Sequence, residues 1–289
     1  MAKQNTYAPV RILQESWEYL RKQPVLSWVL VWLLILPTVL SSWVDRVWKA
    51  QRGFVPGNAL HFEPLDLFYL SLSIFFALLT LWGVSAVLLV GKRMVVRRAG
   101  RTRSSFRRVI LDALPMVFPL LLTSILQQCL VFYRALLYII PVGMAFYVIH
   151  RALLGPADAA RAAFLSLLIL SPLLIPAVVY WLRTILFPAV FGCEEKAYRE
   201  ALQRSSALIR GRFGPVVLTI LALALLTFLP AIIISWVTAL LTPAGPVLLP
   251  YAMDIIHAAL SSTALLMFIL AMTGLYGRLK ENAPKHVEV

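Results

Sequence analysis

The chain has 289 residues, of which 61% are hydrophobic and only 14% are charged, whereas soluble domains carry roughly 25% charged residues. A water-soluble fold cannot bury this much apolar surface, so the composition excludes an ordinary soluble enzyme or binding domain. Unbroken apolar runs of about twenty residues predict membrane-spanning helices, because a barrel would show short strands of alternating polarity. We therefore expect an all-α integral membrane protein, one polytopic domain over residues 1–289 with about six transmembrane helices.

The first predicted element is an amphipathic helix over residues 7–23. Its apolar residues recur at three- and four-residue spacing: Val10, Leu13, Trp17 and Leu20. This spacing places them on one helix face, as in helices that lie at a membrane surface. Pro24 ends the helix, and two apolar runs follow, at about Val25 to Trp48 and Leu67 to Gly91. We expect these runs to be the first two spans.

Residues 92–108 form a strongly basic segment without an acid. Its arginines are Arg93, Arg97, Arg98, Arg101, Arg103, Arg107 and Arg108. By the positive-inside rule this loop is cytoplasmic, and both termini are then cytoplasmic too. Such residues attract anionic lipids, each contributing about 1 kcal/mol near the surface. A formal charge of +14 also suits nucleic acid, but the position between two spans favours the lipid surface, so we expect no nucleic-acid partner.

The apolar stretch from Met116 to Phe191 admits two interpretations. It holds either two long spans, about 116–152 and 160–193, or four short ones with breaks near Arg134, Ala157 and Pro176. Two spans are favoured, because the polar breaks are too short and too apolar for loops and membrane helices tolerate proline kinks. A second surface helix, Ser105 to Leu114, is expected to lead into this stretch.

A third amphipathic helix is predicted over residues 194–212, with Glu194 and Glu195 in its first turn. One face carries the apolar and small residues Tyr198, Ala201, Leu202, Ser205, Leu208 and Ile209. Two last spans follow, at about 215–241 and 247–277. Each group of one surface helix and two spans resembles the others, which suggests a three-fold repeat over residues 7–93, 102–193 and 196–279.

A motif pattern stands out in residues 172–217. Its parts are, in order, Ile175-Pro176, Arg183, Pro188, Glu194, Ala201-Leu202-Gln203-Arg204-Ser205 and Arg210-Gly211-Arg212-Phe213. The pattern resembles the membrane domain that accompanies some glycerophosphoryl diester phosphodiesterases, together with its uncharacterised prokaryotic relatives. It departs from them at Ala177, where the family usually has glycine. The resemblance implies a multi-span membrane module in a bacterial or archaeal inner membrane, without the catalytic barrel of the fusion proteins.

Ionisable residues within predicted spans are the candidate site residues, because each costs several kcal/mol at the bilayer centre unless it is compensated. Arg183 lies near the middle of its apolar run, so it could bind an anionic head group. Its structural alternatives are a pair with Asp254, Asp112 or a helix carbonyl end, or snorkelling of the side chain to the membrane surface. Arg134 is a second candidate, with hydrogen bonding between helices as its simpler role. Asp254 and His257 are three residues apart on one helix face and could form a proton relay.

No catalytic motif, metal-ligand spacing or disulfide framework occurs, so we expect no enzyme, no metal and no cofactor. The expected function is a non-catalytic inner-membrane role in lipid or envelope organisation, or as a membrane subunit for a protein partner or homo-oligomer. Anionic membrane lipids are the expected ligands. The alternative is a transporter that moves a lipid-like or anionic solute through a cavity near Arg183. A polar cavity reaching Arg183 would favour transport, and dry packing there would favour a structural role.

Overall fold

The structure is a computed structural model that describes residues 8–52, 64–96, 105–154, 171–241 and 249–282. The described residues form helices and short connections, with no strand among them. In chain order the elements are α1 (Pro9–Lys22), α2 (Pro24–Val29), a π-helical turn (Leu30–Ile35), α3 (Leu36–Arg52), α4 (Pro64–Val96), α5 (Phe106–Leu154), a 3-10 turn (Ser171–Leu174), α7 (Ile175–Thr184), α8 (Phe187–Glu194), α9 (Tyr198–Arg210), α10 (Phe213–Leu241) and α11 (Leu249–Glu281).

Six helical segments in the described ranges are long and apolar enough to cross a membrane, which confirms the expectation of about six. They are Pro24–Ala50, Leu65–Val95, Phe106–Pro141, Ile175–Glu194, Phe213–Val237 and Pro250–Glu281. The fold is therefore compatible with a multi-pass membrane protein. The three-fold repeat stays a prediction.

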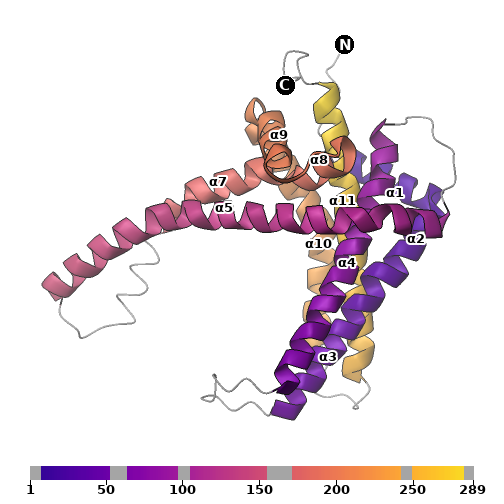
Figure 1. Cartoon of the computed structure of the whole chain (residues 1–289), viewed down its shortest axis with the longest axis horizontal. Coiled ribbons are helices and arrows are strands. Elements are labelled where there is room, and N and C mark those ends of the chain that lie inside the picture. The colour runs from indigo at the N-terminus through magenta and orange to yellow at the C-terminus, as the bar shows by residue number, and fades with distance from the viewer. Residues whose placement is uncertain (1–7, 53–63, 97–104, 155–170, 242–248, 283–289) are drawn as a thin grey trace.

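The helices form a bundle and a lateral arm (Figure 1). Helices α3, α4, α10 and α11 run side by side in the bundle, whereas α5 crosses α4 and extends sideways with α7 along it. Helix α9 lies over α8 and the base of the arm. The protein core lies where α4, α8, α9 and α11 meet, and α8 is buried there from Phe187 to Cys193 except at Pro188.

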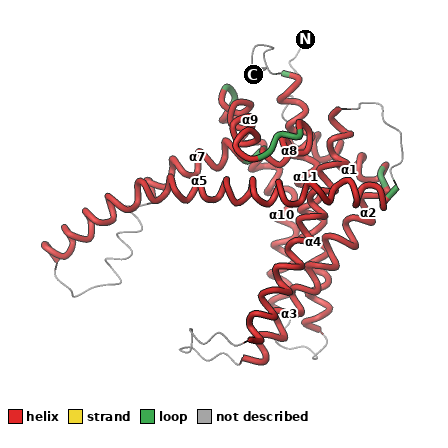
Figure 2. The backbone as a smooth tube through the Cα atoms, viewed as in Figure 1, coloured by secondary structure: helices red, strands yellow, loops and turns green. Residues whose placement is uncertain are grey.

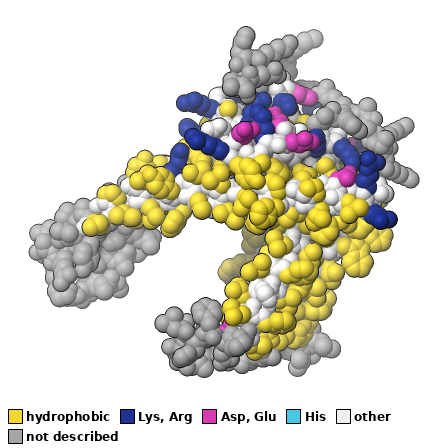
Figure 3. Space-filling view, viewed as in Figure 1, with side chains coloured by type: hydrophobic (Ala, Val, Ile, Leu, Met, Phe, Trp, Pro, Cys, Tyr) yellow, Lys and Arg dark blue, Asp and Glu magenta, His cyan; other side chains and the backbone are white. Residues whose placement is uncertain are grey.

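The end of the molecule that holds α1, α9 and the last turns of α11 carries most of the charged side chains in view, and we call it the basic end (Figure 3). An ion pair of 2.6 Å between Arg278 of α11 and Glu15 of α1 links two of these helices. Below it, hydrophobic side chains cover the visible faces of both the arm and the bundle. The described ends of the chain, in α1 and α11, therefore lie on the same side.

Helix α5 corrects one sequence-based expectation and agrees with another. It is one continuous helix of 49 residues, so Ser105–Leu114 is not a separate surface helix. No break occurs at Arg134, in agreement with the favoured interpretation. Packing explains the continuity, because α4 covers the first turns of α5 and the Trp82 indole donates to the Ile110 carbonyl at 2.9 Å. Tertiary contacts here outweigh the tendency of Pro115 to break a helix.

The fourth apolar segment departs from a straight span, because it is broken into α7 and α8 at Ile185 and Leu186. Pro188 accounts for the break: it lacks an N–H, and its ring would clash with the carbonyl of Thr184 in a continuous helix. Helix α8 then ends at Glu194, and Glu195 adopts a left-handed conformation with φ of 58°. A short connection leads to α9 (Figure 2). The two glutamates thus end α8 and do not begin α9, contrary to the expectation.

Candidate functional site

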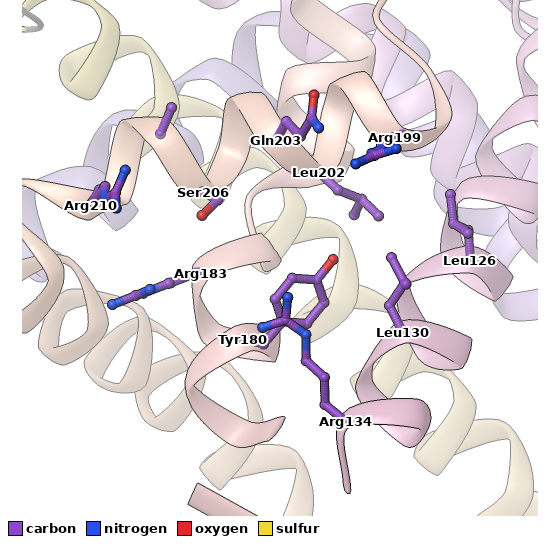
Figure 4. A pocket seen from close by; sticks show the side chains of 11 residues that line it. Leu126, Leu130, Arg134, Tyr180, Arg183, Arg199, Leu202, Gln203, Ser206 and Arg210 are labelled. Atoms are coloured by element: carbon purple, nitrogen blue, oxygen red, sulfur yellow. The ribbon is translucent and has the colours of Figure 1, made fainter. Parts of the chain in front are cut away.

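A cavity of about 960 Å³ lies between α5, α7 and α9 at the basic end (Figure 4). Its lining residues are Leu126, Leu130 and Arg134 from α5, Tyr180 and Arg183 from α7, and Arg199, Leu202, Gln203, Ser206, Ala207 and Arg210 from α9. None of these lining residues is acidic. The cavity is therefore strongly positive, with four arginines on its walls.

Helix α9 presents a polar stripe to this cavity. The stripe follows helical periodicity and consists of Arg199, Gln203, Ser206 and Arg210. The buried side of α9 carries Ala201, Ser205, Leu208 and Ile209. Ser205 fixes α9 against α7, because its hydroxyl donates to the Arg183 carbonyl at 3.0 Å. The same hydrogen bond holds the α7 backbone at Arg183 against α9.

Arg183 has no carboxylate to compensate its charge in the described part of the chain. Its Nε atom is buried without a hydrogen-bond partner, and its guanidinium carbon lies 5.6 Å from the centre of the Phe213 ring. The partners expected from sequence are elsewhere, since Asp254 binds Arg46 and Asp112 lies 3.8 Å from Arg108. Neither of the two carboxylates considered as partners of Arg183 therefore pairs with it.

Arg134 reaches the same cavity from α5. Its guanidinium lies over the Tyr180 ring, 3.8 Å from the centroid, a close cation–π contact. The structure thus brings the candidates Arg134 and Arg183 together and adds two arginines, Arg199 and Arg210, that sequence reasoning missed. Among the described residues none of these four arginines forms an ion pair with an acid.

A neighbouring cluster around Glu194 shows the opposite arrangement. Its carboxylate accepts a hydrogen bond from the Tyr276 hydroxyl at 2.6 Å and lies 3.3 Å from both Arg204 and Lys280. The Glu194 side chain is only 9% exposed, so this pairing takes place largely out of water. The cluster joins α8, α9 and α11. Sequence reasoning missed it because Tyr276 and Lys280 are more than eighty residues away along the chain.

Asp254 and His257 do not form the relay expected from their spacing. The carboxylate of Asp254 accepts hydrogen bonds from Arg46 at 2.7 and 3.1 Å, in the part of the bundle remote from the basic end. The His257 side chain is exposed and makes no hydrogen bond to Asp254. An arginine from α3 therefore neutralises Asp254, which gives this carboxylate a structural role.

The basic segment 92–108 is described only in part. Arg107 and Arg108 are exposed at the start of α5, whereas Arg97, Arg98, Arg101 and Arg103 lie outside the described residues. Arg93 is half-buried near Tyr19 of α1. Burial raises the pKa of Tyr19 to about 12, with the charge of Arg93 partly opposing the rise. The Tyr19 hydroxyl donates to the Val90 carbonyl at 2.8 Å and so ties α1 to α4.

Comparison with known proteins adds no relative, because no protein-family model, curated protein or solved structure matches the chain. Within the described ranges, no group of three or more His, Cys, Asp and Glu side chains is placed to hold a metal ion. The arginine-lined cavity is therefore the feature of the described residues that bears on function.

Proposed function

We propose that this protein is a non-catalytic, multi-pass membrane protein that binds an anionic lipid head group in the cavity between α5, α7 and α9. The observation that carries the proposal is a cavity with four arginines on its walls and no acid among its lining residues. Arg183 is the least exposed of these four arginines, and its buried Nε atom without a hydrogen-bond partner makes its charge costly unless an opposite charge compensates it. A phosphate group supplies that charge, and the planar guanidinium binds its oxygens in pairs.

The charge distribution supports an orientation with the basic end in the cytoplasm of a prokaryotic cell, at its inner membrane. Lys and Arg side chains gather at this end (Figure 3). Helices α1, α9 and the start of α5 would then lie on the cytoplasmic leaflet. Val10 and Trp17 of α1 are exposed and border an apolar groove formed with α10 and α11. An interfacial helix would bury such residues among the lipid chains.

The resemblance to the phosphodiesterase-associated membrane domain points to the same place. Residues that carry that resemblance line the cavity: Arg183 of α7, and Leu202 and Gln203 of the α9 motif. Ser205 of the same motif holds α9 against α7. A module that holds anionic lipids in this way would serve lipid or envelope organisation, or act as the lipid-binding subunit of a partner protein.

A second candidate, transport of a lipid-like or anionic solute, rests on the same cavity because it reaches Arg183. Proteoliposomes distinguish the two functions. A transporter moves a labelled anionic lipid between leaflets and loses this activity in Arg183→Gln. A lipid-binding protein retains the lipid and leaves the leaflet distribution unchanged.

The proposal is tested by the lipid that copurifies with the protein. Wild type, Arg183→Gln and Arg107→Gln are purified identically, and anionic lipid per protein is quantified by mass spectrometry. Arg107 is exposed on α5 outside the cavity, so its variant controls for charge alone. A hydrogen bond to a charged group contributes about 1.5–3 kcal/mol, so we expect Arg183→Gln to lose about tenfold or more of the bound lipid. Arg183→Lys should recover it only in part.

Equal lipid content in wild type and Arg183→Gln, together with a lowered melting temperature of the variant, would contradict the proposal. Arg183 would then be a structural residue. Equal loss in Arg107→Gln would also contradict it, because general surface charge would then hold the lipid.

A further inference from the structure

The cavity has two positive poles (Figure 4). At the N-terminal end of α9, Arg199 shares the space around Tyr180 with Arg134, whose guanidinium stacks on that ring. We call this pair the Arg134–Arg199 pole. At the C-terminal end of α9, Arg210 lies on the side of Arg183, which approaches Phe213. We call this pair the Arg183–Arg210 pole.

The two poles lie at opposite ends of the polar stripe on α9. Arg199 and Arg210 are eleven residues apart on a continuous helix, which separates their backbones by about 16 Å at about 1.5 Å per residue. A phosphate oxygen lies about 2.7–2.9 Å from the nitrogen that donates to it. In Figure 4 the guanidinium groups of the two poles lie on different sides of the cavity. With the guanidinium groups placed in this way, each pole offers a separate binding position for an anionic group.

The wall between the poles is neutral. Gln203 and Ser206 offer uncharged hydrogen-bonding groups there, and Leu126 and Leu130 of α5 make the opposite wall apolar. Along the cavity a charged surface is thus followed by a neutral one and then by a second charged one. This order fits a ligand with two anionic groups joined by a short polar linker. The apolar wall, continuous with the exposed hydrophobic face of α5, suits acyl chains. A soluble diphosphate would leave that wall without a partner.

Building on the proposed function, we infer that the cavity selects an anionic lipid with two phosphate groups over a lipid with one. One such molecule satisfies both poles, so it ties α5, α7 and α9 together through a single ligand. A single-phosphate lipid satisfies one pole and leaves the other pole uncompensated.

The test is a titration of the delipidated full chain in detergent micelles, followed by native mass spectrometry. The probes are phosphatidylglycerol, diphosphatidylglycerol and inorganic pyrophosphate. We expect diphosphatidylglycerol to bind one to one and at least about tenfold more tightly than phosphatidylglycerol. Arg199→Gln and Arg210→Gln each remove one of the two arginines of a pole, so both variants should lose most of the preference for diphosphatidylglycerol. Lys49→Gln, at an exposed residue of α3 outside the cavity, should keep the wild-type preference. Both pole residues are exposed, and equal melting temperatures verify that the variants fold.

The outcomes separate this inference from the proposed function. Equal affinity of the wild type for the two lipids, or a preference that survives in both pole variants, overturns the inference and leaves lipid binding intact. Failure of either lipid to bind overturns the proposed function as well. Pyrophosphate binding as tightly as diphosphatidylglycerol overturns the lipid assignment and identifies a soluble anion as the ligand.

Discussion

The two sides of α9 handle charge in opposite ways. On one side Arg204, whose side chain is 14% exposed, is paired with Glu194, which also receives Lys280 and Tyr276. On the other side Arg199 and Arg210 face a cavity without an acid. Matched charges link α8, α9 and α11 into one unit, and unmatched charges create a place for an external anion. An ion pair with an acid, and not the presence of an arginine alone, therefore distinguishes the structural arginine of α9 from the arginines that we propose bind a ligand.

Helical geometry produces this difference from one short sequence. At about 100° per residue, Arg199 and Arg210 lie within about 20° of each other around the helix. Arg204 is rotated from each of them by about 120–140°. An acid in α8 therefore reaches Arg204 and cannot reach the cavity-facing arginines.

The largest predicted effect comes from the matched side. Glu194→Gln removes the negative charge shared by Arg204 and Lys280. Breaking a buried ion pair from one side costs about 3–5 kcal/mol, so we expect a large fall in the melting temperature of the protein in detergent. Glu195→Gln is the control: its side chain is 76% exposed, and among the described residues it forms an ion pair only with Lys92. Equal melting temperatures of the two variants would show that the Glu194 cluster does not hold the helices.

A second matched pair, Arg46 with Asp254, should have a smaller effect. The Arg46 side chain is 40% exposed, so solvent weakens the attraction. We expect a double-mutant cycle of Arg46→Gln and Asp254→Asn to give a coupling energy of about 1 kcal/mol in thermal unfolding. The double variant should lose less unfolding free energy than the sum of the losses in the two single variants. Additive effects would mean that the pair adds nothing.

The smallest predicted effect concerns Tyr19. Tyr19→Phe removes the hydrogen bond to the Val90 carbonyl and should cost about 1 kcal/mol near neutral pH. The folded-state pKa of about 12 exceeds the ordinary value of 10.0, so this stabilisation is present below pH 10 and is lost as pH rises toward 12. Melting curves of wild type and Tyr19→Phe should therefore converge between these pH values. A constant difference across this range would contradict the assignment.

Composition and apolar runs were sufficient to predict the six membrane-length segments. Arg183 was predicted as a site residue because a charge in an apolar run is costly. Arg199 and Arg210 could not be found in this way, since exposed arginines on an amphipathic helix are ordinary in sequence. The contact of Arg134 with Tyr180 joins α5 to α7, and only the fold brings them together.

The element boundaries show the same limit. Pro188, four residues after Thr184, ends α7 and lets α8 turn into the core, whereas the favoured sequence-based interpretation places one span over this region. Glu194 was assigned to the following helix because acids favour helix N-termini. Long-range partners, Tyr276 and Lys280, hold it at the end of α8 instead. In both places, tertiary contacts set the helix boundary, and the spacing of residues along the chain does not reveal these contacts.

Binding of an anionic lipid at Arg183 is tested most directly by the effect of such a lipid on the melting temperature of the delipidated protein. Arg183 has no acidic partner in the described part of the chain, so Arg183→Gln should melt at or above the wild-type temperature without lipid. Added phosphatidylglycerol should raise the melting temperature of wild type and Arg107→Gln, because a ligand stabilises the state that binds it. It should raise the melting temperature of Arg183→Gln by clearly less than that of wild type, because the other arginines of the cavity remain. The same lipid-induced rise in all three proteins would contradict the account.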